Sequence, residues 1–223
     1  MKKFLLFATY LLSISTILIA QEWKNIPGPT TTAVVSAKIS RDGNIVFATK
    51  NEVWISKNKG IDWELINNGL SLNQFNTYPK IFVSNDSEFY LSYSNHLYRF
   101  DFNSYGWILV HNHMGPLDLL MFDENGNIYY SSGKNLYVST NKGVLFTRVF
   151  NVNLIITGIA DGGPNRKYAV VNNINKLVLY SFKEDGSNMT IVNPIMPGKQ
   201  LFCKPGSGTL FSVNLHRIYR SVD

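Results

Sequence analysis

VWISKNKGIDW, residues 53–63, joins an alternating strand to a polar turn and to the aromatic start of a second strand. Degraded copies recur to the end of the chain, with steps of 44, 39, 41 and 41 residues between the anchors Val53, Leu97, Leu136, Leu177 and Ile218. A period near forty residues with strand-like segments is typical of blade arrays, in which each repeat is one small sheet. The stretch therefore predicts a repeat architecture rather than one ordinary domain.

Each repeat is expected to contain four antiparallel strands separated by turn signals. Asp42-Gly43 and Asn125-Gly126 are strong two-residue hairpin signals. After the first twenty residues, no segment has the three-to-four-residue apolar spacing of an amphipathic helix. We therefore expect an all-β fold, a β-propeller of about five four-stranded blades. The approximate limits of these blades are 33–66, 80–110, 117–150, 154–192 and 199–223, the last blade completed by residues 22–26.

The two ends of this array are each incomplete. Glu22–Ile26 has the form of a fourth strand without its repeat, and Arg217–Val222 is a third strand without its fourth. Antiparallel pairing of the two segments would close the ring and hide an open sheet edge. The alternative is a truncated array of a larger propeller with about six to eight blades.

Aromatic residues indicate a common register in the first three repeats. The third strand and the start of the fourth carry aromatics nine residues apart in three pairs: Trp54 and Trp63, Tyr98 and Trp107, Tyr137 and Phe146. Large aromatics are usually packed in the interior. This register predicts that Trp63 is among the most buried residues.

The turn from Ser56 to Trp63 resembles the Asp-box, S-x-D-x-G-x-x-W, of BNR-repeat propellers, with Asn58 at the Asp position. Ser139 to Phe146 is a second copy, again with Asn and with Phe in place of Trp. The resemblance implies a β-propeller and a structural use of the box, in which a short side chain caps backbone N–H groups and glycine takes a positive φ. The residues to which this role is assigned are Ser56, Asn58, Gly60, Trp63, Ser139, Asn141, Gly143 and Phe146.

Propellers with this box include sialidases, some glucan hydrolases, sortilin-like sorting receptors and photosystem assembly factors, so the resemblance does not choose a function. The Arg-Ile-Pro context of the sialidase arginine triad is absent here. No phosphate-binding loop, Gly-x-Ser-x-Gly elbow or Cys–His pair at a suggestive spacing is present. We therefore expect no enzyme activity, no catalytic residue and no cofactor.

Three groups of polar or aromatic residues are candidate sites. His111 and His113 would lie on one face of a strand, but the sequence suggests no third ligand, so we expect a loop and no metal site. Four carboxylates sit beside turn glycines, where such residues are ordinary: Asp123, Glu124, Glu184 and Asp185. Several tyrosines near repeat edges are candidates for a binding face, although interior packing is favoured: Tyr78, Tyr93, Tyr105, Tyr129 and Tyr130.

Residues 1–20 have the pattern of an export signal. Lys2 and Lys3 precede a short apolar run, and Ala20 is a small residue before Gln21. The run is short for a membrane span, which is the alternative reading. Cys203 is the only cysteine, so an internal disulfide is excluded. We expect a secreted or periplasmic/extracellular protein in which residues 21–223 form one propeller domain, with no membrane span after cleavage.

Charge excludes one class of partner. The formal net charge is +6, but the basic residues are scattered without a run of five or six, so nucleic-acid binding is not expected. The sequence predicts an exported, non-catalytic binding or scaffold module for protein or glycan. The alternatives are a glycan-active hydrolase of the Asp-box superfamily and a fragment of a larger propeller.

Overall fold

A computed structural model describes residues 26, 28–29, 32–72, 77–112, 117, 119–152, 154–173, 176–203, 209–214 and 216–221. The predicted export signal and Trp23 lie outside these residues. Within them, no helix is long and apolar enough to cross a membrane.

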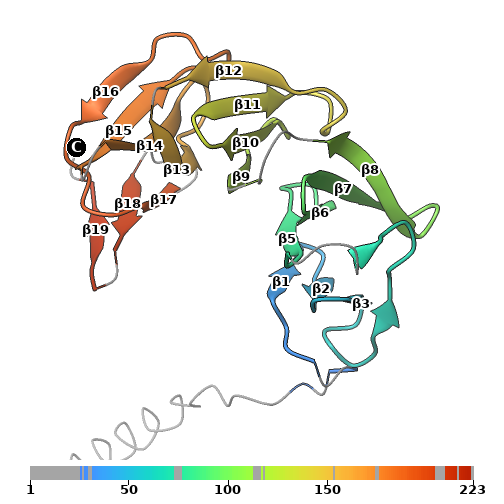
Figure 1. Cartoon of the computed structure of the whole chain (residues 1–223). Helices are drawn as coiled ribbons and strands as arrows, with labels where there is room; N and C mark the ends of the chain where they lie inside the picture. Colours follow the sequence, from blue (N-terminus) through green and yellow to red (C-terminus); the bar gives the residue numbers. More distant parts are fainter. Residues whose placement is uncertain are drawn as a thin grey trace, which may run out of the picture.

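The described residues form five antiparallel sheets (Figure 1). Sheet 1 contains β1 (Ser36–Ile39), β2 (Ile45–Ala48), β3 (Val53–Ser56) and β4 (Glu64–Leu65). Sheet 2 contains β5 (Lys80–Val83), β6 (Phe89–Tyr93), β7 (His96–Asp101) and β8 (Gly106–Asn112). Sheet 3 contains β9 (Leu119–Phe122), β10 (Ile128–Ser132), β11 (Asn135–Ser139) and β12 (Thr147–Asn151). Sheet 4 contains β13 (Ile155–Asp161), β14 (Lys167–Asn173), β15 (Lys176–Phe182) and β16 (Thr190–Asn193), and sheet 5 contains β17 (Gln200–Cys203), β18 (Leu210–Val213) and β19 (Ile218–Arg220).

Strands within each sheet follow one another in sequence order, because each is joined to the next by a short hairpin. The predicted all-β fold of four-stranded antiparallel sheets is confirmed in sheets 1 to 4. The sheets are arranged around an arc, with the first strand of each sheet on the inner side (Figure 1). Neighbouring first strands contact one another, β1 with β5, β9 with β13, and β13 with β17. The inner side of the arc is therefore built from the beginnings of all five sheets.

The hydrophobic core is divided among the contacts between adjacent sheets. Ile55 of sheet 1 packs in one cluster with Phe89 and Trp107 of sheet 2. The other clusters lie between sheets 2 and 3, between sheets 3 and 4, and between sheets 4 and 5. Sheets 2, 3 and 4 are covered on both faces, so all five residues of β6 are buried.

Trp63 is not among the most buried residues, so that prediction is wrong. It is half-buried, whereas Trp107 at the equivalent place in sheet 2 is 4% exposed. The difference arises because Trp107 lies between sheets 1 and 2. Trp63 packs on Phe47, on the face of sheet 1 that no described sheet covers.

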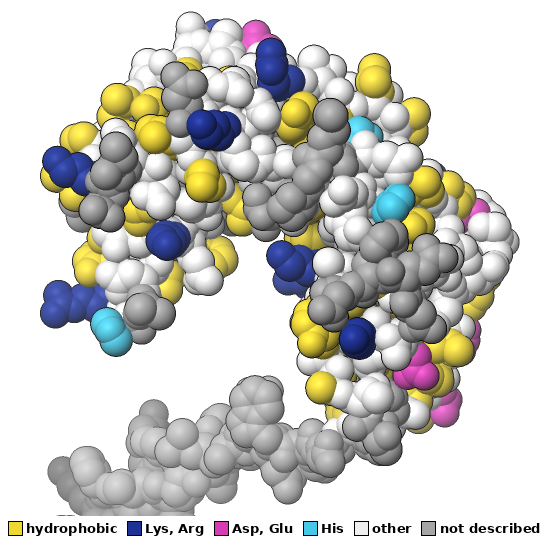
Figure 2. Space-filling view, viewed as in Figure 1, with side chains coloured by type: hydrophobic (Ala, Val, Ile, Leu, Met, Phe, Trp, Pro, Cys, Tyr) yellow, Lys and Arg dark blue, Asp and Glu magenta, His cyan; other side chains and the backbone are white. Residues whose placement is uncertain are grey.

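The predicted closure of the ring is not seen among the described residues. The five sheets form an open arc whose ends, at sheets 1 and 5, lie apart (Figures 1 and 2). Sheet 5 shows three strands, and residues 22–25 and 222 lie outside the described residues. Ile26, the described residue of the N-terminal segment, lies against Gly60 of sheet 1 rather than against β19.

Candidate functional site

The first box-like turn, between β3 and β4, is held by its own side chains. Ser56 Oγ accepts hydrogen bonds from the backbone N–H groups of Gly60 (2.8 Å) and Asn58 (3.4 Å). Asn58 Oδ1 accepts one from the N–H of Asp62 (2.8 Å). Gly60 has a φ of 89°, a left-handed conformation that favours glycine. All of these contacts are local to the hairpin.

The second box-like turn, between β11 and β12, repeats this geometry. Ser139 Oγ accepts from Gly143 N–H (2.9 Å), and Asn141 Oδ1 accepts from Leu145 N–H (2.9 Å). Phe146 packs edge-on against Tyr130, with ring centroids 4.8 Å apart. A structural role for the eight box residues stays a prediction, and the hydrogen bonds of Ser56, Asn58, Ser139 and Asn141 to their own turns support it.

The other sequence candidates are dispersed. His111 Nε2 lies 3.3 Å from the hydroxyl of Tyr130, and His113 is outside the described residues. In the part of the chain that the structure describes, no three His, Cys, Asp or Glu side chains are placed to hold a metal ion. Among the tyrosines, Tyr93 and Tyr129 are buried as interior packing requires, whereas Tyr78 is 63% exposed.

A groove runs along the inner side of the arc, at the end where the first strand of each sheet turns into the second. Its volume is about 530 Å³, within the range of ligand sites. All five sheets contribute to it. We call it the axial groove, and its lining residues are Arg41, Asn85, Asp86, Met121, Phe122, Glu124, Ile159, Ala160, Asp161, Leu201, Phe202 and Cys203.

The axial groove combines an apolar floor with a charged rim. Met121, Ile159 and Phe202 belong to the inner strands β9, β13 and β17, and Phe202 is 55% exposed. Arg41 and Glu124 come from the turns that follow β1 and β9, and both are exposed. Burial and the charge of Asp161 raise the pKa of the Cys203 thiol, so this cysteine is a weak nucleophile at neutral pH.

Behind the groove, a buried ion-pair network joins sheets 3 and 4. The side chain of Lys167, at the start of β14, is 2% exposed. Its Nζ lies 2.8 Å from Asp161 Oδ1 and 3.2 Å from Asp123 Oδ2. Asp123 is fully buried and accepts two hydrogen bonds from Asn127, one from its N–H (2.9 Å) and one from its side-chain amide (3.0 Å). Asn127 also donates to Glu184 of sheet 4.

The network favours the charged forms of Asp123 and Lys167. Burial alone would raise the pKa of Asp123, but the hydrogen bonds from Asn127 and the charge of Lys167 outweigh it and lower the pKa below the usual value. Burial likewise lowers the pKa of Lys167, but the hydrogen bond and charge of Asp161 and the charge of Asp123 raise it overall. This network fixes the turns that form one wall of the groove.

Sequence reasoning missed this network and the groove. The sequence predicts that Asp123 is a plain turn former, which it is in part, because its Oδ1 also accepts from the N–H of Asn125 (2.9 Å). Lys167 carried no signal, because a lysine at the start of a strand is ordinary. The ion pair between Lys167 and Asp123 and the axial groove both depend on the packing of neighbouring sheets, which the sequence does not show.

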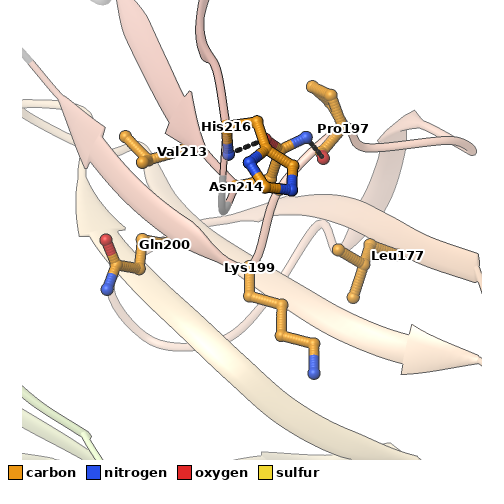
Figure 3. Close-up of a pocket in the computed structure, with 8 residues that line it drawn as sticks. Leu177, Pro197, Lys199, Gln200, Val213, Asn214 and His216 are labelled. Carbon is orange, nitrogen blue, oxygen red and sulfur yellow. Dashed lines mark hydrogen bonds between the residues drawn. The ribbon is translucent and has the colours of Figure 1, made fainter.

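A second cavity lies at the opposite end of sheets 4 and 5 (Figure 3). Its volume is about 620 Å³. Asn214 donates to the carbonyl of Pro197 (3.1 Å) and accepts from the N–H of His216 (3.0 Å), so this amide is used to hold the loop. Lys199 and Gln200 line the same cavity. Because only two sheets build it, the axial groove remains the stronger candidate site.

No protein-family model matches this sequence, and no curated protein matches it. Solved structures do resemble it. Virginiamycin B lyase from Staphylococcus aureus matches over 87% of this chain and 72% of its own, with a TM-score of 0.63 and 15% identity. YCF48 from Cyanidioschyzon merolae matches over 90% of this chain and 73% of its own, with a TM-score of 0.65 and 14% identity.

The extracellular domain of the one component system BT4673 from B. thetaiotaomicron also matches, over 90% of this chain and 28% of that chain, with a TM-score of 0.66 and 15% identity. At these identities the likeness shows the fold alone. The neighbours are β-propellers, and the chain has their architecture of antiparallel sheets around an axis.

Proposed function

We propose that this chain is an exported, non-catalytic β-propeller that binds a segment of another protein in the axial groove. The observation that carries the proposal is the groove itself, to which all five sheets contribute residues. A site built from every repeat is supported by the rigid packing between sheets, so it is preorganised for a ligand.

The lining favours a protein over a glycan. Met121, Ile159 and Phe202 offer apolar surface that peptide side chains would cover favourably. A sugar would instead bring hydroxyl groups, which lose water when they meet an apolar floor and gain no hydrogen bond there. One structural neighbour, YCF48, is known bound to a D1 peptide, which supports peptide binding by this fold.

A glycan-active hydrolase is the alternative, and virginiamycin B lyase is a neighbour that is an enzyme. Glycoside hydrolysis commonly uses two carboxyl groups in different environments, one of them kept protonated by a water-poor site. In the groove, Asp161 is bonded to Lys167, and Asp86 and Glu124 are exposed. This arrangement supports binding without catalysis.

Export belongs to the same proposal. The pattern of residues 1–20 supports a cleaved signal, which would deliver a secreted or periplasmic protein. The two box-like turns support a place among BNR-repeat propellers, since Ser56 and Ser139 make the same hydrogen bonds to Gly60 and Gly143. A partner would then be met outside the cytoplasm.

The proposal predicts that a substitution in the axial groove weakens peptide binding, whereas one outside the groove does not. Phe202→Ser should weaken a peptide selected against the purified protein by about five- to thirty-fold, because a half-exposed aromatic that the ligand buries contributes on the order of 1–2 kcal/mol. The peptide would be taken from a displayed library, and binding measured by calorimetry. Ile61→Ser is the matched control, since Ile61 is 77% exposed and lies at the box turn, outside the groove. Equal affinity of both variants, or hits on a glycan array alone, would contradict the proposal.

The proposal also includes a closed ring of about five blades, with residues 22–26 as the fourth strand of sheet 5. In sheets 1, 2 and 3 the residue after the third-strand anchor pairs with the second residue after the fourth-strand aromatic: Trp54 with Leu65, Tyr98 with Leu109, and Tyr137 with Arg148. The same register would place Asn25 opposite Tyr219. Directly paired residues are close enough for a disulfide.

Cysteines at Asn25 and Tyr219, in a Cys203→Ser background, should therefore form a disulfide within one chain under mild oxidation. Ile218→Cys with Asn25→Cys is the control, because Ile218 is one register position away and faces the other side of the sheet. Non-reducing electrophoresis and mass spectrometry measure the product. The proposed closure of the ring is wrong if the cysteines at positions 25 and 219 form no disulfide, or form only disulfide-linked dimers.

A further inference from the structure

One face of sheet 1 has no sheet against it. By register, this outer face carries Ala37 and Ile39 of β1, Phe47 of β2, Trp54 of β3 and Leu65 of β4. The opposite face packs on sheet 2. Ile39 is 64% exposed, so apolar surface remains open to water on this outer face.

Part of the outer face is occupied in a specific way by Ile26. A β-carbon added at Gly60 would lie 2.6 Å from Cγ2 of Ile26. The same contact occurs between neighbouring sheets, where a β-carbon at Gly143 of sheet 3 would lie 3.2 Å from Cγ2 of Val110 in β8. Gly186 of sheet 4 likewise faces a residue of β12. In sheets 3 and 4 the glycine of the last turn therefore packs against an apolar residue on the fourth strand of the preceding sheet, and Gly60 of sheet 1 meets Ile26 in the same way.

The spacing in the sequence agrees with this contact. Val110 is three residues after Trp107, where the fourth strand of sheet 2 begins with its aromatic. Ile26 is three residues after Trp23. Ile26 is thus the fourth-strand residue of a repeat that precedes sheet 1, by position in the sequence and by its contact with Gly60.

A hydrogen-bond donor without a partner lies near the same slot over Gly60. The indole nitrogen of Trp63 is buried and has no hydrogen-bond partner among the described residues. In sheet 2, the equivalent nitrogen of Trp107 donates to the carbonyl of Ile66, three residues into the fourth strand of the preceding sheet (2.7 Å). By its spacing from Trp23, Ile26 corresponds to Ile66, but in the structure its carbonyl does not accept the indole proton of Trp63, and the acceptor position is empty. A buried N–H without a partner costs free energy, which favours occupation of this slot.

We infer that the outer face of sheet 1 is a docking site for residues 22–26 of this chain, which lie on it as a strand. Ile26 already lies in the slot over Gly60. Docking of the whole segment would bring the carbonyl of Ile26 to the indole proton of Trp63 and would shield the apolar face. A second copy of the chain is the rival occupant, since its own fourth-strand sequence could take the same slot. The same chain is favoured because its Ile26 already lies there in the structure.

The test follows the indole proton of Trp63 by nuclear magnetic resonance on protein labelled with ¹⁵N-tryptophan. Its signal would be assigned by Trp63→Phe. In the wild type the Trp63 proton should exchange slowly with deuterated water, and Ile26→Asp should speed the exchange by about tenfold or more. Ile61→Asp, a charge added to the exposed side of the same turn, should leave the rate within about twofold.

Each outcome decides the inference. Rapid exchange in the wild type, or a rate that Ile26→Asp does not change, would overturn it. Slow exchange that is lost on hundredfold dilution would assign the slot to a second copy and overturn it as well. Global unfolding is separated by recording the core signal of Trp107 in the same sample, which should stay protected in Ile26→Asp. The inference does not depend on the peptide site or on the Asn25–Tyr219 disulfide, which tests the other edge of the strand.

Discussion

Lys167→Met is expected to destabilise the protein by about 3–5 kcal/mol, because removing one partner of a buried ion pair leaves the other charge unpaired. Asp123 is fully buried, and Lys167 is its nearest cation at 3.2 Å. Methionine keeps much of the length and volume of the lysine stem, so the loss would reflect charge rather than a cavity. Urea unfolding followed by tryptophan fluorescence measures the change in the free energy of unfolding.

Lys142→Met is the matched control. The Lys142 ammonium lies 2.8 Å from Glu88, but the lysine side chain is 53% exposed. An exposed pair of this kind contributes less than about 1 kcal/mol. Equal losses in the two variants would show that the network behind the groove is no stronger than a surface salt bridge.

The stabilisation that this network contributes depends on pH. The lowered pKa of Asp123 means that its contribution in the wild type is present above its ordinary pKa of about 4 and is lost as pH falls below it. The raised pKa of Lys167 means that its contribution is present below about pH 10 and is lost at higher pH. The free-energy difference between the wild type and Lys167→Met should therefore be largest between these limits and shrink in acid.

The strands of this fold could be predicted from the sequence because they are joined by local hairpins. Asp42-Gly43 and Asn125-Gly126 follow β1 and β9, and both glycines have a positive φ. The box-like turns could also be placed, because Ser56 and Asn58 bond to atoms within six residues of their own positions. Alternation and turn chemistry act over short distances, so a single repeat carries enough information to locate them.

The candidate site could not be predicted in this way, because it depends on which turns meet. Arg41, Asp86 and Glu124 occupy the corresponding turns of three sheets and have different side chains. Each reads as an ordinary turn residue, and only the stacking of the sheets brings them to one groove. The burial of Lys167 has the same origin, since its partner Asp123 lies in the neighbouring sheet.

The burial of the aromatic residues shows most directly what the sequence does not predict. Trp63 and Trp107 begin the fourth strands of successive repeats, nine residues after an aromatic of the third strand. Their sequence contexts predict the same surroundings. They differ because sheet 1 covers Trp107, while the equivalent cover for Trp63 would come from a sheet before the first. A periodic sequence specifies the contact between neighbours but does not state where the array ends.

Trp107→Ala is expected to cost about 3–5 kcal/mol, as for large aromatics lost from a well-packed core. The indole is 4% exposed, packs on Phe100 with ring centroids 5.2 Å apart, and donates to the carbonyl of Ile66. The substitution would open a cavity between sheets 1 and 2 and leave that carbonyl without its partner. Tyr78→Ala is the control, because Tyr78 is exposed and should contribute less than about 1 kcal/mol.

Trp63→Ala, measured by the same urea titration, makes the comparison informative about the ring. In an open arc Trp63 has the cover of one strand at most, so its loss should cost about 1–2 kcal/mol, well below that of Trp107. In the closed ring that we propose, sheet 5 would lie over it as sheet 1 lies over Trp107, and the two losses should be similar. If Trp107→Ala lowered the free energy of unfolding by less than about 1 kcal/mol, the packing between sheets 1 and 2 would be contradicted. Loss of a large aromatic buried between two sheets should destabilise the protein by more than that.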